Sequence, residues 1–348
     1  MRSPLTTLCY VEQDDKYLML HRVSKKNDVN KDKWIGIGGH FEEGESPEEC
    51  LLREAKEETG LTLTSFRFRG IVTFVAEGWT PEYMCLYTAD GFEGEMIPCN
   101  EGCLEWVPKS EVTKLNLWEG DKIFLKLLAE EAPFFSMKLV YQGDILKYAA
   151  VDGKALELFD VCDEHGVPTG RVTERSVAHA SGIMHRTAHI WVVRESADGG
   201  WELLLQRRSA DKASFPLCYD TSAAGHVSAG DDYEESAYRE LQEELGITAR
   251  PGELEYVGLY DSGDIEASFH GKPFHDREIS AVYVYRKDVD ETRLCLQKEE
   301  VDSVRWMKYE ECCAIAKQND SRFCIHPREL ELLGRCLGAH TENGIVCS

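Results

Sequence analysis

One stretch of the sequence occurs twice, and this repeat limits what the chain can fold into more than any other feature. The first copy, residues 39–61, reads GHFEEGESPEECLLREAKEETGL, and the second, residues 225–247, reads GHVSAGDDYEESAYRELQEELGI. The copies start 186 residues apart (225 minus 39), whereas solenoid repeats recur every ~20–50 residues. A chain of 348 residues also has room for two domains. The sequence therefore predicts two copies of one domain.

Each copy contains a predicted helix whose ends are marked by characteristic residue types. In the first copy, Ser46 is a typical N-cap, Pro47 suits the first helical position and Gly60 suits a C-terminal stop. In the second copy, Asp232 and Gly246 take the places of Ser46 and Gly60. These signals predict a helix over about residues 47–58 and a matching helix in the second copy.

Each predicted helix carries three glutamates at positions i, i+3 and i+4, which lie on one face. They are Glu54, Glu57 and Glu58 in the first copy and Glu240, Glu243 and Glu244 in the second. Like charges this close repel one another, and a hard divalent cation such as Mg²⁺, which prefers oxygen ligands, would relieve the repulsion. A solvated acidic surface helix is the alternative, because the net charge of the chain is −24.

The spacing around the three glutamates favours the metal-binding interpretation. Gly39, Glu45 and Arg53 precede them and Gly60 follows, in the pattern G-x5-E-x7-R-E-U-x-E-E-x-G-U with U an aliphatic residue. This pattern resembles the Nudix box with every fixed position filled, and in the second copy Asp231 replaces the first glutamate. The chain thus resembles a tandem Nudix hydrolase. The resemblance implies an α/β fold class, with two Nudix-fold α/β/α sandwiches that have mixed sheets.

The Nudix resemblance implies that water attacks a diphosphate bond with the help of Mg²⁺ or Mn²⁺, because metal ions neutralise phosphate oxygens and activate water. The implied metal ligands are Gly39, through its carbonyl, and Glu54, Glu57, Glu58, Glu240, Glu243 and Glu244. The implied catalytic base is Glu54 or Glu57 in the first copy and Glu240 or Glu243 in the second. Arg53 and Arg239 are implied to orient these glutamates by charge-assisted hydrogen bonds.

Families of this kind often add one acid from a later strand or loop to the metal site. Glu101 is the candidate in the first domain, with an ordinary surface role as the alternative, and Glu278 is the candidate in the second. The match between the copies also extends upstream, where Arg22 corresponds to Arg208. These two arginines are candidate substrate-binding residues.

The first domain resembles the MutT-type purine nucleoside triphosphate pyrophosphohydrolases. The matching features are Trp34, Trp118 followed by Asp121, and a terminal hairpin over residues 134–148. In that subgroup a tryptophan stacks on the purine and an acid bonds the base edge, so the resemblance implies these roles for Trp118 and Asp121. Ile35 stands where some members have a base-recognising asparagine, so 8-oxo-dGTP is a hypothesis. A core position is the alternative for Trp118.

The second domain resembles the isopentenyl-diphosphate isomerase-like Nudix proteins. The residues that carry the resemblance are Phe159-Asp160-Val161, Gly170, His179, Gly182, His185-Arg186, Leu205-Gln206-Arg207-Arg208, Lys212, Pro216 and Gly225-His226. In the isomerases, histidines at places like His185 and His226 bind metal, with acids near Asp276 and Glu278. Ala224 stands where the isomerases have their catalytic cysteine, and Glu240, Glu243 and Glu244 are all present, so hydrolysis is expected. Structural roles for His179, His185 and His226 are the alternative.

We expect a first domain over residues 1–150 and a second over residues 151–348, with a C-terminal helix and tail from about residue 320. The charge of −24 argues against nucleic acid or an anionic membrane as the main partner. A small phosphorylated substrate, most simply a nucleotide, stays compatible, because bound cations reverse the local field. The 13 cysteines without a C-x-x-C pair, and no signal peptide or long apolar run, predict a reduced cytoplasmic protein.

Two other functions stay open at this point. In one, the second domain is the main hydrolase, on another organic diphosphate, and the first domain is auxiliary. In the other, the chain is a non-catalytic nucleotide sensor. Such regulators usually carry a nucleic-acid-binding module and an incomplete box, whereas this sequence has two complete carboxylate triplets and no basic recognition helix.

Overall fold

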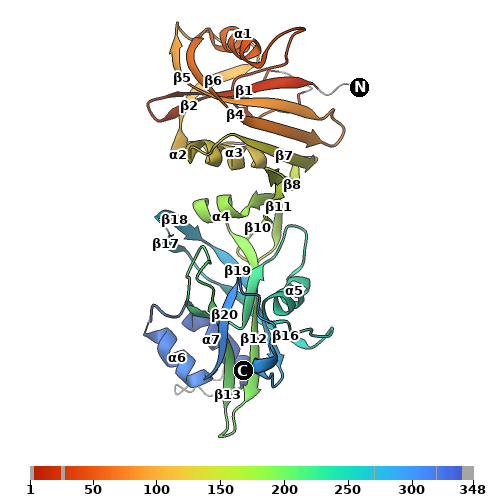
Figure 1. Cartoon of the computed structure of the whole chain (residues 1–348), viewed down its shortest axis with the longest axis vertical. Coiled ribbons are helices and arrows are strands. Elements are labelled where there is room, and N and C mark those ends of the chain that lie inside the picture. The colour runs from red at the N-terminus through yellow and green to blue at the C-terminus, as the bar shows by residue number, and fades with distance from the viewer. Residues whose placement is uncertain (1–3, 25–27, 270, 319, 339–348) are drawn as a thin grey trace. The chain divides into compact units, whose positions relative to one another are not determined.

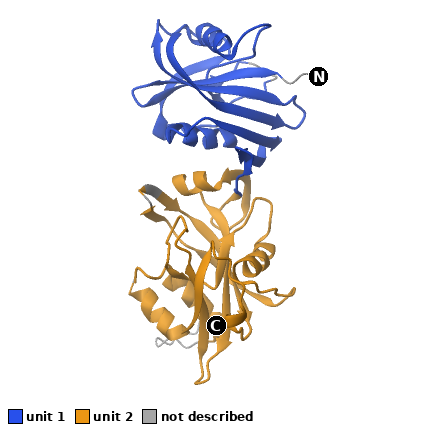
Figure 2. Cartoon of the chain, viewed as in Figure 1, with its two compact units in different colours: residues 1–158 blue, residues 159–348 orange. Residues whose placement is uncertain are grey.

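The computed structural model describes residues 4–24, 28–269, 271–318 and 320–338 (Figure 1). The chain forms two compact units, Met1–Leu158 and Phe159–Ser348 (Figure 2). We call them unit 1 and unit 2 and describe each by itself. The tail expected at the C-terminus, residues 339–348, lies outside the described residues.

Unit 1 is built on a mixed nine-stranded sheet with the order β3-β2-β1-β5-β4-β7-β8-β9, and β6 pairs with β2. The strands are β1 (Leu5–Gln13), β2 (Lys16–Arg22), β3 (Trp34–Ile35), β4 (Thr62–Ala76), β5 (Glu82–Glu93), β6 (Gly102–Pro108), β7 (Phe135–Gln142), β8 (Ile145–Val151) and β9 (Lys154–Ala155). The pairs β1–β5 and β4–β7 are parallel, and the other pairs are antiparallel.

Helices cover both faces of this sheet. They are α1 (Pro47–Thr59), α2 (Lys109–Val112) and α3 (Glu119–Ala129). Leu51 and Ala55 of α1 pack in one core with Cys9 of β1, and Phe124 of α3 lies against the ring of Tyr10, the next residue of the same strand. Successive side chains of a strand point to opposite faces, so α1 and α3 lie on opposite sides of the sheet, as Figure 1 also shows.

Unit 2 has a mixed seven-stranded sheet with the order β14-β13-β12-β19-β16, to which β15 and β20 add by pairing with β12 and β13. Two separate hairpins, β10–β11 and β17–β18, complete the strands. The strands are β10 (Leu158–Cys162), β11 (Pro168–Glu174), β12 (His185–Glu195), β13 (Trp201–Arg208), β14 (Tyr219–Asp220), β15 (Ala223–His226), β16 (Leu254–Asp261), β17 (Ile265–Phe269), β18 (Lys272–Asp276), β19 (Glu278–Arg286) and β20 (Val301–Lys308).

The helices of unit 2 are α4 (Arg175–Ser181), α5 (Tyr233–Leu245), α6 (Tyr309–Lys317) and α7 (Pro327–Leu337), with a short 3-10 turn at Glu291–Arg293. Leu241 of α5 packs in one core with Ile190 of β12, whereas Leu333 of α7 packs in another with Trp191, the next residue of the strand. The two faces of this sheet are therefore covered as well. The predicted α/β class with two mixed-sheet sandwiches is confirmed.

The two units share one topology, as the repeat predicted. The strand order β2-β1-β5-β4 of unit 1 returns as β13-β12-β19-β16 in unit 2, with β6 on β2 and β20 on β13. Helices α1, α2 and α3 correspond in chain order to α5, α6 and α7. Unit 2 inserts the hairpin β17–β18 between β16 and β19, where unit 1 passes directly from β4 to β5. The shift of 186 residues that relates the two acidic helices therefore does not hold beyond this insertion.

Unit 1 ends later in the sequence than predicted. Strand β9 pairs with β8, so residues 151–158 belong to unit 1, beyond the boundary near residue 150 that the sequence predicted.

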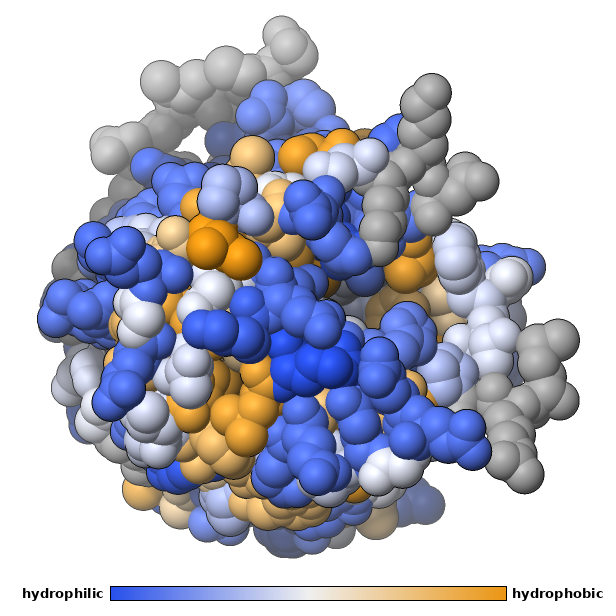
Figure 3. Space-filling model, turned by 90° about the horizontal axis from the view of Figure 1, so that it is seen from above, coloured by the Kyte–Doolittle hydropathy of each residue, from blue (hydrophilic) through white to orange (hydrophobic). Residues whose placement is uncertain are grey.

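Hydrophilic side chains dominate the face seen in Figure 3, in keeping with 29% charged residues. Among the residues that the structure describes, no helix has the length and apolarity needed to cross a membrane.

Candidate active sites

Local signals position the two acidic helices. At the start of α1, Ser46 Oγ accepts a hydrogen bond from the Glu49 N–H at 3.2 Å, and the Glu49 carboxylate accepts one from the Ser46 N–H at 2.8 Å. At the start of α5, the Asp232 carboxylate accepts from the Glu235 N–H at 2.8 Å. Both helices end at a left-handed glycine, with φ of 78° at Gly60 and 71° at Gly246. These ends determine which side chains share a face.

A glycine lies directly against the first glutamate of each acidic face. A methyl group on Gly39 would lie 2.4 Å from the carboxyl carbon of Glu54, and one on Gly225 would lie 2.1 Å from that of Glu240. Only glycine leaves room for the carboxylate at these places. The Gly39 carbonyl, a predicted metal ligand, accepts the Thr7 N–H at 2.9 Å.

An arginine holds the carboxylates of each site. Arg53 donates through Nε and Nη2 to both oxygens of Glu45, at 2.7 and 2.9 Å, and through Nη1 to Glu54 at 2.7 Å. In unit 2, Arg239 donates to Asp231 at 2.8 Å and lies 3.6 Å from Glu240. Such charge-assisted hydrogen bonds fix a carboxylate in one orientation. This geometry agrees with the orienting role expected for both arginines.

The third glutamate of each face is buried. Glu58 accepts the Gly38 N–H at 3.0 Å, and burial raises its pKa to about 8, with the charges of Glu101 and Glu54 adding to the rise. Glu244 accepts the N–H of Ala224 at 3.0 Å, and burial likewise raises its pKa to about 8. Carboxyl groups that are buried beside other acids are stabilised as carboxylates by a cation. The donor set, oxygen atoms of several acids, therefore fits Mg²⁺ or Mn²⁺.

The middle glutamates are the accessible ones. The Glu57 side chain is 61% exposed, and Glu243 is also exposed. Arg53 Nη1 lies 3.4 Å from Glu57, farther than from Glu54. Each acidic face thus runs from a buried carboxyl group to one that reaches solvent.

Glu101 lies just before β6 and forms an ion pair with Arg22, which also pairs with Asp28 at 2.7 Å. In unit 2, Glu300 lies just before β20, forms an ion pair with Lys212, and adds to the raised pKa of Glu244 as Glu101 does for Glu58. Glu300 is therefore the structural counterpart of Glu101. The sequence reasoning missed it, although an acid immediately before the matching strand was the available signal.

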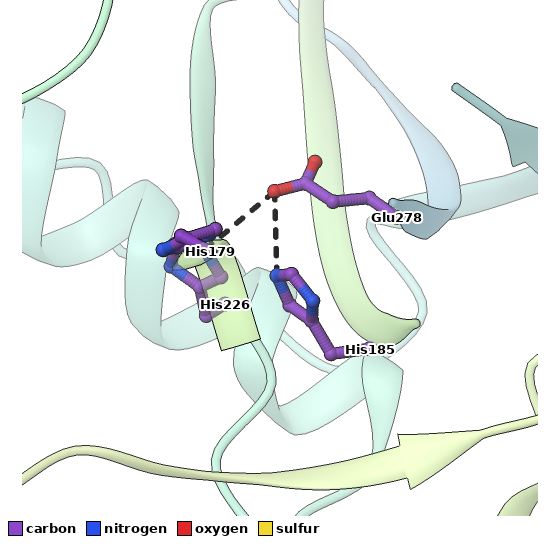
Figure 4. Close-up of side chains that lie close together, drawn as sticks. All are labelled: His179, His185, His226 and Glu278. Atoms are coloured by element: carbon purple, nitrogen blue, oxygen red, sulfur yellow. Dashed lines mark ion pairs between the residues drawn. The ribbon is translucent and has the colours of Figure 1, made fainter. Parts of the chain in front are cut away.

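Glu278, the acid that the sequence suggested for this place, belongs instead to a cluster of three histidines in unit 2 (Figure 4). One ligand atom from each of His179, His185, His226 and Glu278 lies within 4.8 Å of the others. His185 and His226 each direct Nε2 to the same oxygen of Glu278, at 3.6 and 3.5 Å. His179 Nε2 lies 3.5 Å from Asp276.

The surroundings of this cluster hold its imidazoles in one arrangement. Phe159 stacks on both His185 and His226, with ring centroids 4.8 and 4.5 Å apart. Nδ1 of His185 lies 2.8 Å from the Ile183 carbonyl, which leaves Nε2 directed to the cluster. Burial lowers the pKa of His179 to about 3, so this ring is neutral, the form that binds metal. Imidazole nitrogens with one carboxylate fit a divalent transition metal.

The comparisons with known proteins agree with this geometry. The NUDIX domain model matches residues 2–128 and 184–328, which is more than half of the chain. The chain belongs to the Nudix family. Both matches contain a complete acidic helix, so the family assignment covers both units.

Individual Nudix relatives match about half of the chain. Nudix hydrolase 3 of Arabidopsis thaliana is 38% identical over 45% of this chain and 20% of its own length. An uncharacterized Nudix hydrolase of Clostridium acetobutylicum is 36% identical over 42% of this chain and 66% of its own length. One from Listeria monocytogenes is 31% identical over 47% of this chain and 88% of its own length. The chain therefore spans one fifth of the Arabidopsis relative and about two thirds of the Clostridium relative.

Among solved structures, a MutT protein from Bacillus halodurans is 30% identical, with a TM-score of 0.39, over 43% of this chain and 99% of that protein. The structure of DR0079 from Deinococcus radiodurans is 21% identical, with a TM-score of 0.39, over 52% of this chain and 99% of that protein.

The residues proposed to bind a purine in the first Nudix unit lie in the core. Trp118 is 4% exposed, and its indole N–H donates to Asn30 at 2.8 Å. The rings of Phe74 and Tyr141 and the ammonium of Lys33 lie against it. A base could stack on Trp118 only after these neighbours move. Asp121, at 5% exposure, is also buried, which raises its pKa to about 8.

The two matched arginines are held by protein groups. Arg22 is engaged by Asp28 and Glu101. Arg208 donates to Asp220 at 2.9 Å and to the Ser214 carbonyl at 3.1 Å. Substrate contact by either arginine would accordingly compete with these bonds.

Trp118→Ala should destabilise unit 1 by about 3–5 kcal/mol, because it empties a large buried side-chain site. Denaturant unfolding of the full chain measures the loss, with Trp79→Ala as the matched control, since Trp79 is 53% exposed. An unchanged free energy of unfolding together with a raised KM for purine nucleotides would instead show that Trp118 stacks on the base.

Proposed function

We propose that the chain is a hydrolase in which each unit cleaves a diphosphate linkage of a nucleoside diphosphate derivative, with Mg²⁺ or Mn²⁺ as cofactor. The observation that carries the proposal is the acidic face of α1 and its full repetition on α5. In both, one glutamate lies against a glycine backbone, the next reaches solvent and the third is buried. A sensor would not need the complete arrangement twice.

The side chains of unit 1 have separable tasks in this reaction. The Gly39 carbonyl, Glu54, Glu57, Glu58 and Glu101 would hold the cations. When bound, the cations neutralise phosphate oxygens and lower the pKa of the attacking water. Arg53 holds Glu54 and Glu45 in place. Glu57, which has the longer contact to Arg53 and the larger exposure, is better placed than Glu54 to take a proton from water.

Unit 2 has the corresponding groups for the same chemistry. Glu240, Glu243 and Glu244 would hold the cations together with Glu300, and Arg239 holds Glu240 and Asp231. Glu243 corresponds to Glu57 as the proposed base. Ala224 cannot replace the cysteine of the isomerases that this unit resembles, which supports hydrolysis.

We further propose that the substrate of unit 1 is a purine nucleoside triphosphate, with 8-oxo-dGTP as the oxidised form to test. The support is the resemblance of this unit to MutT-type enzymes, and base binding at Trp118 and Asp121 would require their neighbours to move, because both side chains are buried. In unit 2, the histidine cluster and Glu278 favour a second possibility, in which this unit is the main hydrolase on another organic diphosphate. No such cluster accompanies α1 among the described residues.

The test is phosphate or pyrophosphate release by the full chain from 8-oxo-dGTP, dGTP, ADP-ribose and a wider set of organic diphosphates, with Mg²⁺ or Mn²⁺. Activity on at least one compound, lost on chelation with EDTA and restored by the cation, supports a hydrolase. Binding without turnover across the whole set would leave a nucleotide sensor as the function.

The histidine cluster should bind one divalent transition metal per chain. Because His185 supplies a buried imidazole to the cluster, His185→Ala should weaken binding of Zn²⁺ or Mn²⁺ by at least ~100-fold. Metal content after gel filtration and competition titrations measure this without reference to activity. His165→Ala is the matched control, since that side chain is 77% exposed. Equal metal content in both variants would mean that the histidines are structural.

A further inference from the structure

A buried acid stands at the third position of the last helix in both units. In unit 1 it is Asp121, three residues after the N-cap Trp118, and its N–H donates to the Trp118 carbonyl at 3.0 Å. In unit 2 it is Glu329, three residues after the N-cap His326, with the same bond at 3.2 Å. Asp121 is 5% exposed and Glu329 is 2% exposed. The two acids therefore occupy one place in the common fold.

The central strands of the two sheets align around this place. Cys9 of β1 forms a β-bridge with Ile37, and Ile190 of β12 pairs with Ala223. Ile37 and Ala223 both lie two residues before the first glycine of the repeated stretch. Leu8 of unit 1 accordingly corresponds to His189 of unit 2. Beside the shared acid position, an apolar side chain in unit 1 is thus replaced by an imidazole in unit 2.

Glu329 is bound on one oxygen by two side chains of the central strand. Nδ1 of His189 lies 2.9 Å from Oε1, and the Trp191 indole N–H donates to the same oxygen at 3.0 Å. The Glu329 side chain is 3% exposed, whereas that of His189 is 15% exposed. The carboxylate is thus sealed in the protein, and the imidazole is the part of the pair that stays accessible.

A row of polar side chains on one face of β12 runs from the histidine cluster toward His189. His185, Thr187 and His189 alternate along β12 and share one face. Thr187 Oγ1 lies 2.8 Å from the Ser280 hydroxyl and 3.4 Å from Glu278. From His185 to His189 the strand spans ~13 Å. A diphosphate alone is shorter than this, so a substrate held at the cluster would meet His189 with its organic part.

We propose that His189, held by Glu329, is a specificity-determining residue of unit 2 that donates a hydrogen bond to an acceptor atom of the nucleoside part of the substrate. Glu329 is then a positioning residue that acts through His189. Leu8 makes the same place in unit 1 apolar, so the two units select different nucleosides. This role deepens the function proposed above and presupposes that unit 2 binds a nucleoside diphosphate group.

The protonation of His189 supports this donor role. Burial alone would lower its pKa, but the adjacent Glu329 carboxylate raises it to about 9. The ring is therefore charged at neutral pH, with an N–H donor on each nitrogen. A charged donor in a site that excludes most water is left unpaired by a ligand that lacks the acceptor. Such a site therefore discriminates strongly against that ligand.

Binding tests the role of His189 without turnover. The side-chain ¹⁵N signals of His189 in the full chain are followed while ADP, GDP, CDP, UDP or inorganic pyrophosphate is added with Mg²⁺. At least one nucleoside diphosphate should shift them, and pyrophosphate should not, because it has no nucleoside part. Signals that stay unmoved by all four nucleotides, or that move equally with pyrophosphate, would overturn the proposal even if unit 2 proves to be a hydrolase.

Kinetics separate a specificity role from a purely structural one. In a full chain with Glu57→Gln, His189→Leu introduces the residue of unit 1, His189→Gln keeps a donor, and Glu329→Gln removes the partner charge. His189→Leu should raise KM for the preferred substrate at least ~10-fold with kcat within about threefold. His189→Gln should restore most of the loss, and Glu329→Gln should raise KM in the same direction. If all three variants only lower Tm and keep the substrate ranking, the pair merely anchors α7.

Discussion

Glu57→Gln and Glu243→Gln, made singly in the full chain, should each lower the kcat of one unit by about 10²–10⁴-fold and leave the reaction of the other unit intact. The amide has the shape of the carboxyl group but cannot take a proton from water, and it is a poorer ligand for a hard cation. The Glu57 side chain is 61% exposed, so the free energy of unfolding should change by less than about 0.5 kcal/mol. Product release from the substrate of each unit, with thermal unfolding in parallel, measures both effects.

Glu234→Gln is the matched control for this pair. Glu234 is an exposed acid of α5, six residues before Glu240 and therefore on a different side of the helix. Both activities should survive this change. Full activity of the Glu57→Gln, Glu243→Gln double variant on every substrate would show that the acidic faces are not the catalytic sites.

Gly225→Ala should lower the kcat of unit 2 by about 100-fold while the fold stays intact. The added methyl group would lie 2.1 Å from the carboxyl carbon of Glu240, so this flexible side chain must move. The backbone at Gly225 is not left-handed, and alanine can adopt it without strain. A displacement of a catalytic group by ~1 Å is enough to lose about 10²-fold in rate. The measurement is kcat together with Tm, and Gly39→Ala should act in the same way on unit 1.

A shorter acid provides the control for the glycine variants. If displacement of the carboxylate causes the loss, adding Glu240→Asp to Gly225→Ala should recover part of kcat, because the shorter side chain leaves room for the methyl group. Undiminished kcat in Gly225→Ala alone would mean that the reaction does not depend on where Glu240 lies.

The acidic helices were predictable because their determinants are local. Ser46 and Gly60 act within a few residues of the backbone that they cap, and the face shared by the three glutamates follows from helical geometry alone. The repeat then extended the prediction to α5. That unit 2 repeats the fold of unit 1 followed in the same way, since two similar sequences adopt one fold.

The later acid of unit 2 was not predictable from the repeat. Unit 2 has the additional hairpin β17–β18 between its acidic helix and Glu300. A constant shift along the sequence therefore does not lead from Glu101 to Glu300. Glu278, the acid that the sequence proposed, lies beside His185 and His226 and stays a candidate metal ligand there. Only the pairing of β20 with β13 identifies Glu300.

The sequence by itself determined the family and the duplication and led to the metal site proposed for each unit, because these depend on spacings within one helix and its two ends. Only the tertiary structure decided that Trp118 is covered by Asn30 and Tyr141, that His179 joins His185 and His226 at Glu278, and that Glu329 holds His189. The physical reason is that these contacts join residues tens to more than a hundred positions apart. Sheet register and helix packing bring them together, and no local pattern in the sequence records either.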